Sequence, residues 1–185
     1  LVPEDLVQAH RRRALSPEHP YIRGTAQNPD TYFQGRESAN PYYLEVPGIV
    51  QQAMDEFAAL TGRGYDLVEY YGAPEADRVV VIMGSGAQTV RSTVEYLCAH
   101  GQKVGVVQLR MYRPFPTEQV LAAIPASARV VAVMDRTKEP GAGGEPLFLD
   151  IASAIGEAHA AGRRPAMPLL VGGRYGLSSK EFTPA

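Results

Sequence analysis

The segment from Asp135 to Pro146 concentrates residue types that could bind a charged group. Its sequence is Asp-Arg-Thr-Lys-Glu-Pro-Gly-Ala-Gly-Gly-Glu-Pro, with two cationic and three anionic side chains beside three glycines. A connection that only reverses the chain needs neither so much charge nor so much backbone freedom. The segment is therefore predicted either to bind a ligand or to dock against another surface.

Two interpretations of this segment stay open. In the first, Arg136 and Lys138 hold an anion, and the backbone amides of three glycines form an anion-binding nest before the next helix. In the second, the same cations pair with nearby carboxylates or with carboxylates of an adjoining domain. The nest glycines are Gly141, Gly143 and Gly144, and the nearby carboxylates are Asp135 and Glu139.

The segment lies within an alternation of short apolar runs and helical patterns. The predicted strands span 67–71, 79–83, 103–109, 129–134 and 168–171, and the predicted helices span 89–99, 117–124 and 147–160. Strands that alternate with helices of this length favour an α/β fold, with a mostly parallel open sheet and helices on both faces.

Four loops of this fold are expected to meet at one edge of the sheet, because the carboxyl ends of parallel strands lie together and ligands collect there. The loops span 84–87, 110–116, 135–146 and 172–176. The charged side chains that they bring to this edge are Arg110, Arg113, Asp135, Arg136, Lys138, Glu139 and Arg174. Such an edge suits a phosphate, a carboxylate or an acidic neighbouring surface.

The loop with Gly84 and Gly86 resembles a nucleotide-binding turn only in part. It reads Gly-x-Gly-x-x-Thr instead of Gly-x-Gly-x-x-Gly, and the next predicted strand is followed by Arg110, where a nicotinamide site would place an acid. The pattern therefore favours a glycine turn that packs a helix against a strand. A free-standing anion- or nucleotide-binding module is the alternative function.

The first 60 residues are predicted to be helical and irregular. A basic helix covers 4–14, an irregular connector covers 15–30, and a helix begins at Asn40 with Pro41 in its first turn. Apolar residues then recur at spacings of three and four, which predicts one buried helical face. They are Val46, Ile49, Val50, Ala53, Met54, Phe57 and Leu60. The expected division is a tail and connector over 1–39, an α/β domain over 40–181, and the start of a link over 182–185.

Composition excludes several classes of protein. The 185 residues carry a net charge of −2, which argues against a nucleic-acid binder held by bulk electrostatics. The single cysteine, Cys98, excludes an internal disulfide and a cysteine-built cluster within this chain. The histidines have no ligand spacing, so no metal site is predicted, and we assign no catalytic residue. No apolar run could span a membrane, so a cytoplasmic location is expected.

Four stretches of the sequence resemble pyruvate:ferredoxin (flavodoxin) oxidoreductases. They are 23–43, with Arg-Gly-Thr-Ala-Gln-Asn-Pro-Asp and Asn-Pro-Tyr-Tyr; 82–87, Ile-Met-Gly-Ser-Gly-Ala; the Asp135–Pro146 segment; and 172–182, Gly-Gly-Arg-Tyr-Gly-Leu-Ser-Ser-Lys-Glu-Phe. They follow the family's order and cover nearly the whole chain.

The resemblance implies a fold like the carboxy-terminal domain of transketolases and an interior position in a longer polypeptide. The full enzyme would decarboxylate pyruvate with thiamine diphosphate, Mg²⁺, coenzyme A and [4Fe–4S] clusters. It would pass electrons to ferredoxin or flavodoxin, and it would form a homodimer. The cofactors would lie outside this chain, whose role would be a non-catalytic docking domain; a related 2-oxoacid:ferredoxin oxidoreductase is the alternative.

Overall fold

The computed structural model describes residues 2–20, 24, 26–178 and 180–184. The chain divides into two compact units, Leu1–Pro41 and Tyr42–Ala185. Among the described residues, no helix is both long enough and apolar enough to cross a membrane.

The first unit contains two helices, α1 (Glu4–Arg12) and α2 (Pro29–Glu37). The predicted basic helix is confirmed as α1, which has acidic residues in its first turn and basic residues in its last, as the helix dipole favours. The sequence analysis did not predict α2, although Asn28 followed by Pro29 is a typical start of a helix. Residues 21–23 and 25 of the predicted connector lie outside the described residues.

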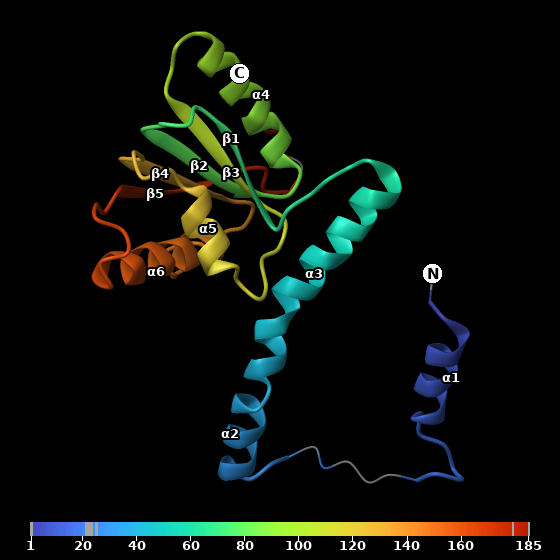
Figure 1. Ribbon diagram of the computed structural model, residues 1–185. Helices are drawn as coiled ribbons and strands as arrows, with labels where there is room; N and C mark the ends of the chain where they lie inside the picture. Colours follow the sequence, from blue (N-terminus) through green and yellow to red (C-terminus); the bar gives the residue numbers. More distant parts are fainter. Residues whose placement is uncertain (1, 21–23, 25, 179, 185) are drawn as a thin grey trace. The chain divides into compact units, whose positions relative to one another are not determined.

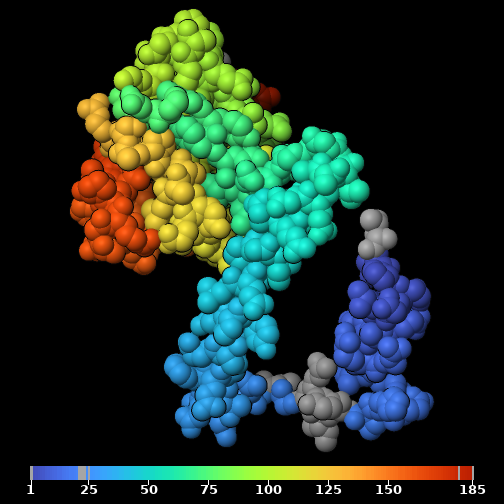
Figure 2. Space-filling view, viewed as in Figure 1, coloured from blue at the N-terminus to red at the C-terminus, as the bar shows by residue number. Residues whose placement is uncertain are grey.

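Helix α3 (Asn40–Thr61) confirms the helix that was expected from Asn40, but the prediction of a buried face is wrong. No residue of α3 is buried, and Ile49 and Leu60 are 60% and 86% exposed. In the space-filling view, the atoms of α3, in cyan, are visible at the surface along the helix (Figure 2). From the middle of α3, the Gln51 amide donates to the Tyr65 carbonyl and accepts from the Leu67 N–H, which ties the helix to the segment that follows it. The spacing of apolar residues was read correctly, but this chain does not cover them.

A five-stranded sheet forms the centre of the second unit, in the order β1-β3-β2-β4-β5. The strands are β1 (Val68–Gly72), β2 (Arg78–Met83), β3 (Val104–Leu109), β4 (Val130–Asp135) and β5 (Leu169–Arg174). Strands β2, β3, β4 and β5 are parallel, and only the edge strand β1 is antiparallel. The predicted mostly parallel α/β sheet is confirmed.

Helices cover both faces of this sheet, as Figure 1 shows. Helix α4 (Gly86–Ala99) packs on one face over β1, β2 and β3, where Val90 and Val94 meet Ile82 and Val106. Helices α5 (Thr117–Ala123) and α6 (Pro146–Ala160) pack on the other face. Ile151 and Ile155 of α6 are fully buried there. The alternation of side chains along β2 and β3 supplies both cores.

The last strand is longer than the sequence analysis predicted. Residues 172–174 were assigned to a loop, but they continue β5 and pair with residues 133–135 of β4. Two glycines hid this continuation, because glycine is depleted in strands. At the outer edge of the sheet, Leu169 and Val171 of β5 are 64% and 43% exposed.

Candidate functional site

The carboxyl ends of β2, β3, β4 and β5 meet at one edge of the sheet, as their parallel pairing requires. Two pockets open at this edge and share Met83, Gly84, Ser85 and Tyr112. We call them the β2–β3 pocket, of about 520 Å³, and the β2–β4 pocket, of about 380 Å³. The four loops predicted to form a site therefore do converge.

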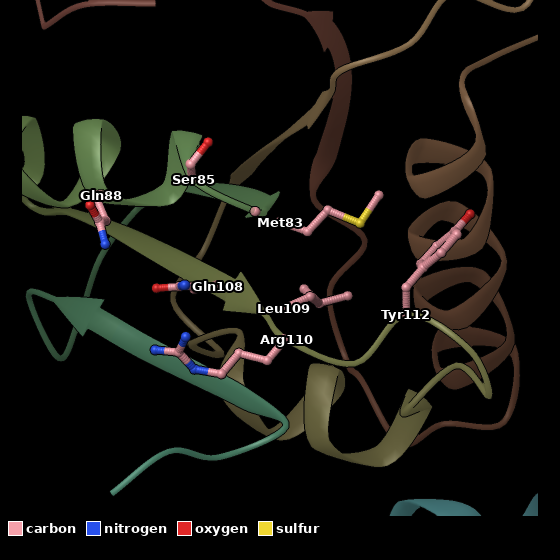
Figure 3. Close-up of a pocket in the computed structure, with 8 residues that line it drawn as sticks. Met83, Ser85, Gln88, Gln108, Leu109, Arg110 and Tyr112 are labelled. Atoms are coloured by element: carbon pink, nitrogen blue, oxygen red, sulfur yellow. The ribbon is translucent and has the colours of Figure 1, made fainter. Parts of the chain in front are cut away.

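The β2–β3 pocket has a polar half and an apolar half. Figure 3 shows Ser85, directly before α4, and Gln88 of α4 on the same side as Gln108 and Arg110 at the end of β3, whereas Met83, Leu109 and Tyr112 point the other way. Arg110 is the only charged residue among the described residues that line this pocket. An anion is therefore the ligand that its electrostatics favour.

Arg110 is held in place by β1 and by an aromatic ring. Its Nη2 donates to Glu69 Oε2 at 2.8 Å, and its guanidinium lies 4.6 Å from the centre of the Tyr65 ring. The hydrogen bond to Glu69 raises the pKa of Arg110. Burial pushes the pKa of Glu69 upward, but the bonds from Arg110 and Tyr71 outweigh it, so the pKa lies below its ordinary value. The pair fixes Arg110 and leaves other guanidinium N–H groups for a ligand.

The β2–β4 pocket lies at the topological switch point of the sheet, because the connection after β2 leads to β3 on one side and β4 lies on the other. Asp135, Arg136 and Glu139 line it, together with Tyr175. The Tyr175 hydroxyl donates to the Met83 carbonyl at 3.1 Å. This tyrosine stands at the start of α4, where a nucleotide phosphate would be placed in a dinucleotide-binding fold.

Gly86 is the residue that allows Tyr175 to lie there. A Cβ at position 86 would come within 2.6 Å of the tyrosine ring. Replacing Gly86 with alanine is expected to displace Tyr175 and to lower the free energy of unfolding by about 1–3 kcal/mol. Gly156→Ala in α6 is the matched control, since nothing lies within 4 Å of that position; it should stabilise by about 0.5–1 kcal/mol. Urea unfolding measures both, and equal effects would contradict the role given to Gly86.

Asp135 is the last residue of β4, and its side chain caps the start of α6 instead of facing a cation. Its side chain is 1% exposed, and its two oxygens accept the N–H groups of Leu147 at 2.9 Å and Phe148 at 3.1 Å. Burial raises the pKa of Asp135, and these two hydrogen bonds offset only part of that rise. The carboxylate thus links the end of β4 to the first turn of α6.

A second buried carboxylate, Glu145, organises the loop. It is 3% exposed and accepts hydrogen bonds from Lys138 Nζ at 3.3 Å, Arg174 Nη1 at 2.8 Å and the Glu139 N–H at 2.7 Å. Burial acts to raise its pKa, but these three donors hold the pKa of Glu145 below its ordinary value. We call these groups the Glu145 cluster. The sequence analysis did not single out Glu145, although an acid directly before Pro146 at a helix start was a usable signal.

The other predicted cations also have partners within the chain. Arg113 pairs with Asp150 at 2.8 Å, and Arg136 donates to the carbonyls of Gly176 at 3.0 Å and Ser178 at 3.5 Å. Burial, with Asp150 beside it, raises the pKa of Tyr112 to about 12. Most charges of this edge therefore bind the loops to one another.

The glycines predicted to form a nest differ from one another. Gly141 has a positive φ of 82°, and Gly144 lies so close to Phe148 that a Cβ would come within 2.5 Å of the ring. A Cβ on Gly143 would meet nothing within 4 Å. Within the described part of the chain, no group of three or more metal-ligating side chains occurs.

Comparison with known sequences establishes the family. The sequence model for the core domain II of pyruvate:ferredoxin oxidoreductase matches residues 76–174, more than half of the chain. The chain belongs to the pyruvate:ferredoxin oxidoreductase family. A second model of this family, described as the thiamine diphosphate-binding part of pyruvate flavodoxin/ferredoxin oxidoreductase, matches residues 1–55.

Long relatives in this family match the chain throughout. It is 58% identical to a pyruvate-flavodoxin oxidoreductase of Trichormus variabilis over 99% of the chain, and 58% identical to one of Rhodospirillum rubrum over all of it. A pyruvate:ferredoxin oxidoreductase of Moorella thermoacetica is 55% identical. The chain spans only about 15% of the length of these relatives.

A solved 2-oxoglutarate:ferredoxin oxidoreductase from Magnetococcus marinus is similar at a lower level, with a TM-score of 0.40 and 21% identity over 69% of this chain and 19% of that one. A likeness of this size says nothing about function.

The described residues of the stretch that matches the thiamine diphosphate-binding model do not by themselves enclose a site for that cofactor. A site for it must enclose a ring and a diphosphate, whereas no described residue between positions 2 and 55 is buried. No chemical step of this chain is therefore derived through that cofactor.

Proposed function

We propose that this chain is part of a longer enzyme that oxidatively decarboxylates pyruvate with coenzyme A, and that its residues 40–181 are the core domain II of that enzyme. The products would be acetyl-CoA, carbon dioxide and reduced ferredoxin or flavodoxin. The support is the match of residues 76–174 and the much greater length of relatives that carry this name. Thiamine diphosphate, Mg²⁺ and [4Fe–4S] clusters would lie in other parts of a cytoplasmic homodimer, and the division at 1–39, 40–181 and 182–185 belongs to this proposal.

Within that enzyme, the chain would act as a docking domain without catalytic residues of its own. The observation that carries this role is the exposed apolar surface of α3. We call it the α3 surface: Tyr42, Tyr43, Leu44, Ile49, Phe57 and Leu60, between 37% and 86% exposed. Apolar surface of this extent marks an interaction site.

The occupant of the α3 surface would be the rest of the thiamine diphosphate-binding domain. Helix α3 begins at Asn40, inside the stretch that matches the thiamine diphosphate-binding model, and ends at Thr61, beyond that match. A helix shared in this way would transmit the position of one domain to the next. Burial of its leucine and isoleucine side chains would stabilise the contact by roughly 1.5–3 kcal/mol for each side chain.

The charged edge of the sheet would support docking more than a path for coenzyme A. Lys138 and Arg174 already share Glu145, and Arg136 is bound to two carbonyls, so these cations are engaged inside the domain. A path for coenzyme A would therefore not depend on Arg136, Lys138 and Arg174.

Replacing Leu44 and Ile49 with glutamate in the full-length enzyme is expected to lower the rate of pyruvate oxidation roughly tenfold, because it places charge in the proposed domain contact. The same double variant of the 185-residue chain should unfold within about 0.5 kcal/mol of wild type, since both side chains are largely exposed. Gln52→Glu, also exposed on α3, is the control and should leave the rate unchanged. Full activity of the double variant would refute the docking role of the α3 surface.

A further inference from the structure

Gln108 is buried at the β2–β3 pocket with its carboxamide oxygen unpaired. The residue is 7% exposed, and its Oε1 is buried without a hydrogen-bond partner among the described residues. Buried polar groups in folded proteins are almost always paired, so a buried carbonyl oxygen without a partner requires an explanation.

The position of Gln108 in β3 does not call for a polar residue. Val104 and Val106 lie on the same face of β3 as Gln108 and pack under α4. Ile82 of the neighbouring strand β2 lies beside Gln108. An aliphatic side chain would continue that core without any unpaired group. A carboxamide at this site therefore lowers stability unless a further molecule pairs with it.

The surroundings of Gln108 carry a net positive charge. Arg110 and Glu69 pair with each other, and Arg91 of α4 lies over the Tyr71 ring at 3.5 Å from its centre. No carboxylate pairs with Arg91 among the described residues. These three charged groups sum to one positive charge around β1 and β3, and the member that lines the pocket is the cation Arg110, which favours an anion there.

The spacing of Gln108 and Arg110 along the chain places their side chains on the same face. Gln108 and Arg110 are two positions apart, so they lie on one face and about 6.6 Å from each other; Figure 3 shows both pointing in the same direction, with Gln88 opposite them on α4. We propose that the β2–β3 pocket binds a small organic anion, a carboxylate or a phosphate, that carries an amide group a few bonds from its charge. Arg110 holds the anion, and Gln108 Oε1 accepts a hydrogen bond from the N–H of the ligand's amide.

The experiment uses three matched ligands on the 185-residue chain. N-Acetyl-β-alanine has both a carboxylate and an amide N–H. 5-Oxohexanoate replaces only that N–H with a methylene, and N-ethylacetamide lacks only the carboxylate. Titration followed by backbone amide NMR at residues 84–88 should show saturable binding of N-acetyl-β-alanine. Each of the other two should bind at least tenfold more weakly, and equal affinity of all three would overturn the proposal.

A variant of Gln108 separates ligand binding from folding. Gln108→Met should raise the Tm of the chain, because it removes an unpaired buried group. The same substitution should weaken the binding of N-acetyl-β-alanine at least tenfold. Gln102→Met is the control; this glutamine is exposed, bonds to Arg78 at 2.9 Å, and should leave affinity unchanged. Unaltered affinity of Gln108→Met would overturn the proposal.

The source of the ligand is a separate outcome. An acidic side chain beside a peptide N–H in another domain offers the same chemistry as a free metabolite. If a side chain of another domain is the natural occupant, N-acetyl-β-alanine binds the 185-residue chain but not a longer polypeptide in which that domain fills the pocket. If a free metabolite is the natural occupant, N-acetyl-β-alanine binds both. Since these titrations use the chain alone, they stand or fall independently of the proposed docking function.

Discussion

Replacing Asp135 with alanine is expected to lower the free energy of unfolding by about 3 kcal/mol. The reason is that the N–H groups of Leu147 and Phe148 would lose their acceptors in a place that water does not reach, since Asp135 is 1% exposed. Asp135→Asn should lose less, because one oxygen still accepts one of the two N–H groups. Urea unfolding followed by circular dichroism measures both variants.

Asp150→Ala is the control for this prediction. Asp150 lies on α6, the helix whose first turn Asp135 caps, and it pairs with Arg113 at 2.8 Å, but the Arg113 side chain is 56% exposed. Exposed pairs contribute less than about 1 kcal/mol. If the two alanine variants lost equal stability, the assignment of Asp135 as the structural link between β4 and α6 would fail.

Glu145→Gln is expected to lower the Tm at neutral pH by roughly 5 °C. The substitution removes the negative charge that Lys138 and Arg174 share, and so leaves two cations without their common partner. Glu139→Gln is the control, because the side chain of Glu139 is exposed and bonds only to Thr137 at 3.5 Å. A Tm loss as large for Glu139→Gln would contradict the special position of Glu145.

The effect of Glu145→Gln should depend on pH in a defined direction. The pKa of Glu145 in the folded chain lies below its ordinary value of 4.5, so the stability it contributes is present above that value and is lost as the pH falls through the lower folded pKa. Wild type and variant should therefore converge in acid. Asp135 has the opposite sign: its pKa is raised above 3.8, so its ionisation costs some stability as the pH rises from 3.8 through the higher folded pKa. Thermal unfolding across the acid range shows whether the two carboxyl groups differ in this way.

The sheet could be predicted from the sequence because its evidence is local. Alternating apolar runs and helical spacing mark β2, α4, β3 and β4 within short stretches of the sequence, and parallel pairing follows from the helices between them. The convergence of the four loops followed from that topology. The predicted glycine turn at Gly84 and Gly86 lies where expected, although it is Tyr175, distant in the sequence, that packs against Gly86.

The remaining features depend on partners that sequence spacing does not reveal. The apolar spacing of α3 was a correct reading of a helix, but whether such a face is buried depends on what covers it. The Glu145 cluster joins residues 29 positions apart through long side chains, and no local pattern reports such a meeting. The unpaired state of Gln108 became visible only when all neighbours of one strand position were known.

The exposed outer edge of β5 has a consequence for the molecule in solution. Within the described part of the chain, β5 pairs with β4 alone, so one side of its backbone keeps free N–H and C=O groups next to the exposed Leu169 and Val171. An open edge of this kind is a template on which a foreign strand can add, and apolar side chains along it strengthen such an addition. Strand addition at this edge is thus one route by which the chain would self-associate at high concentration.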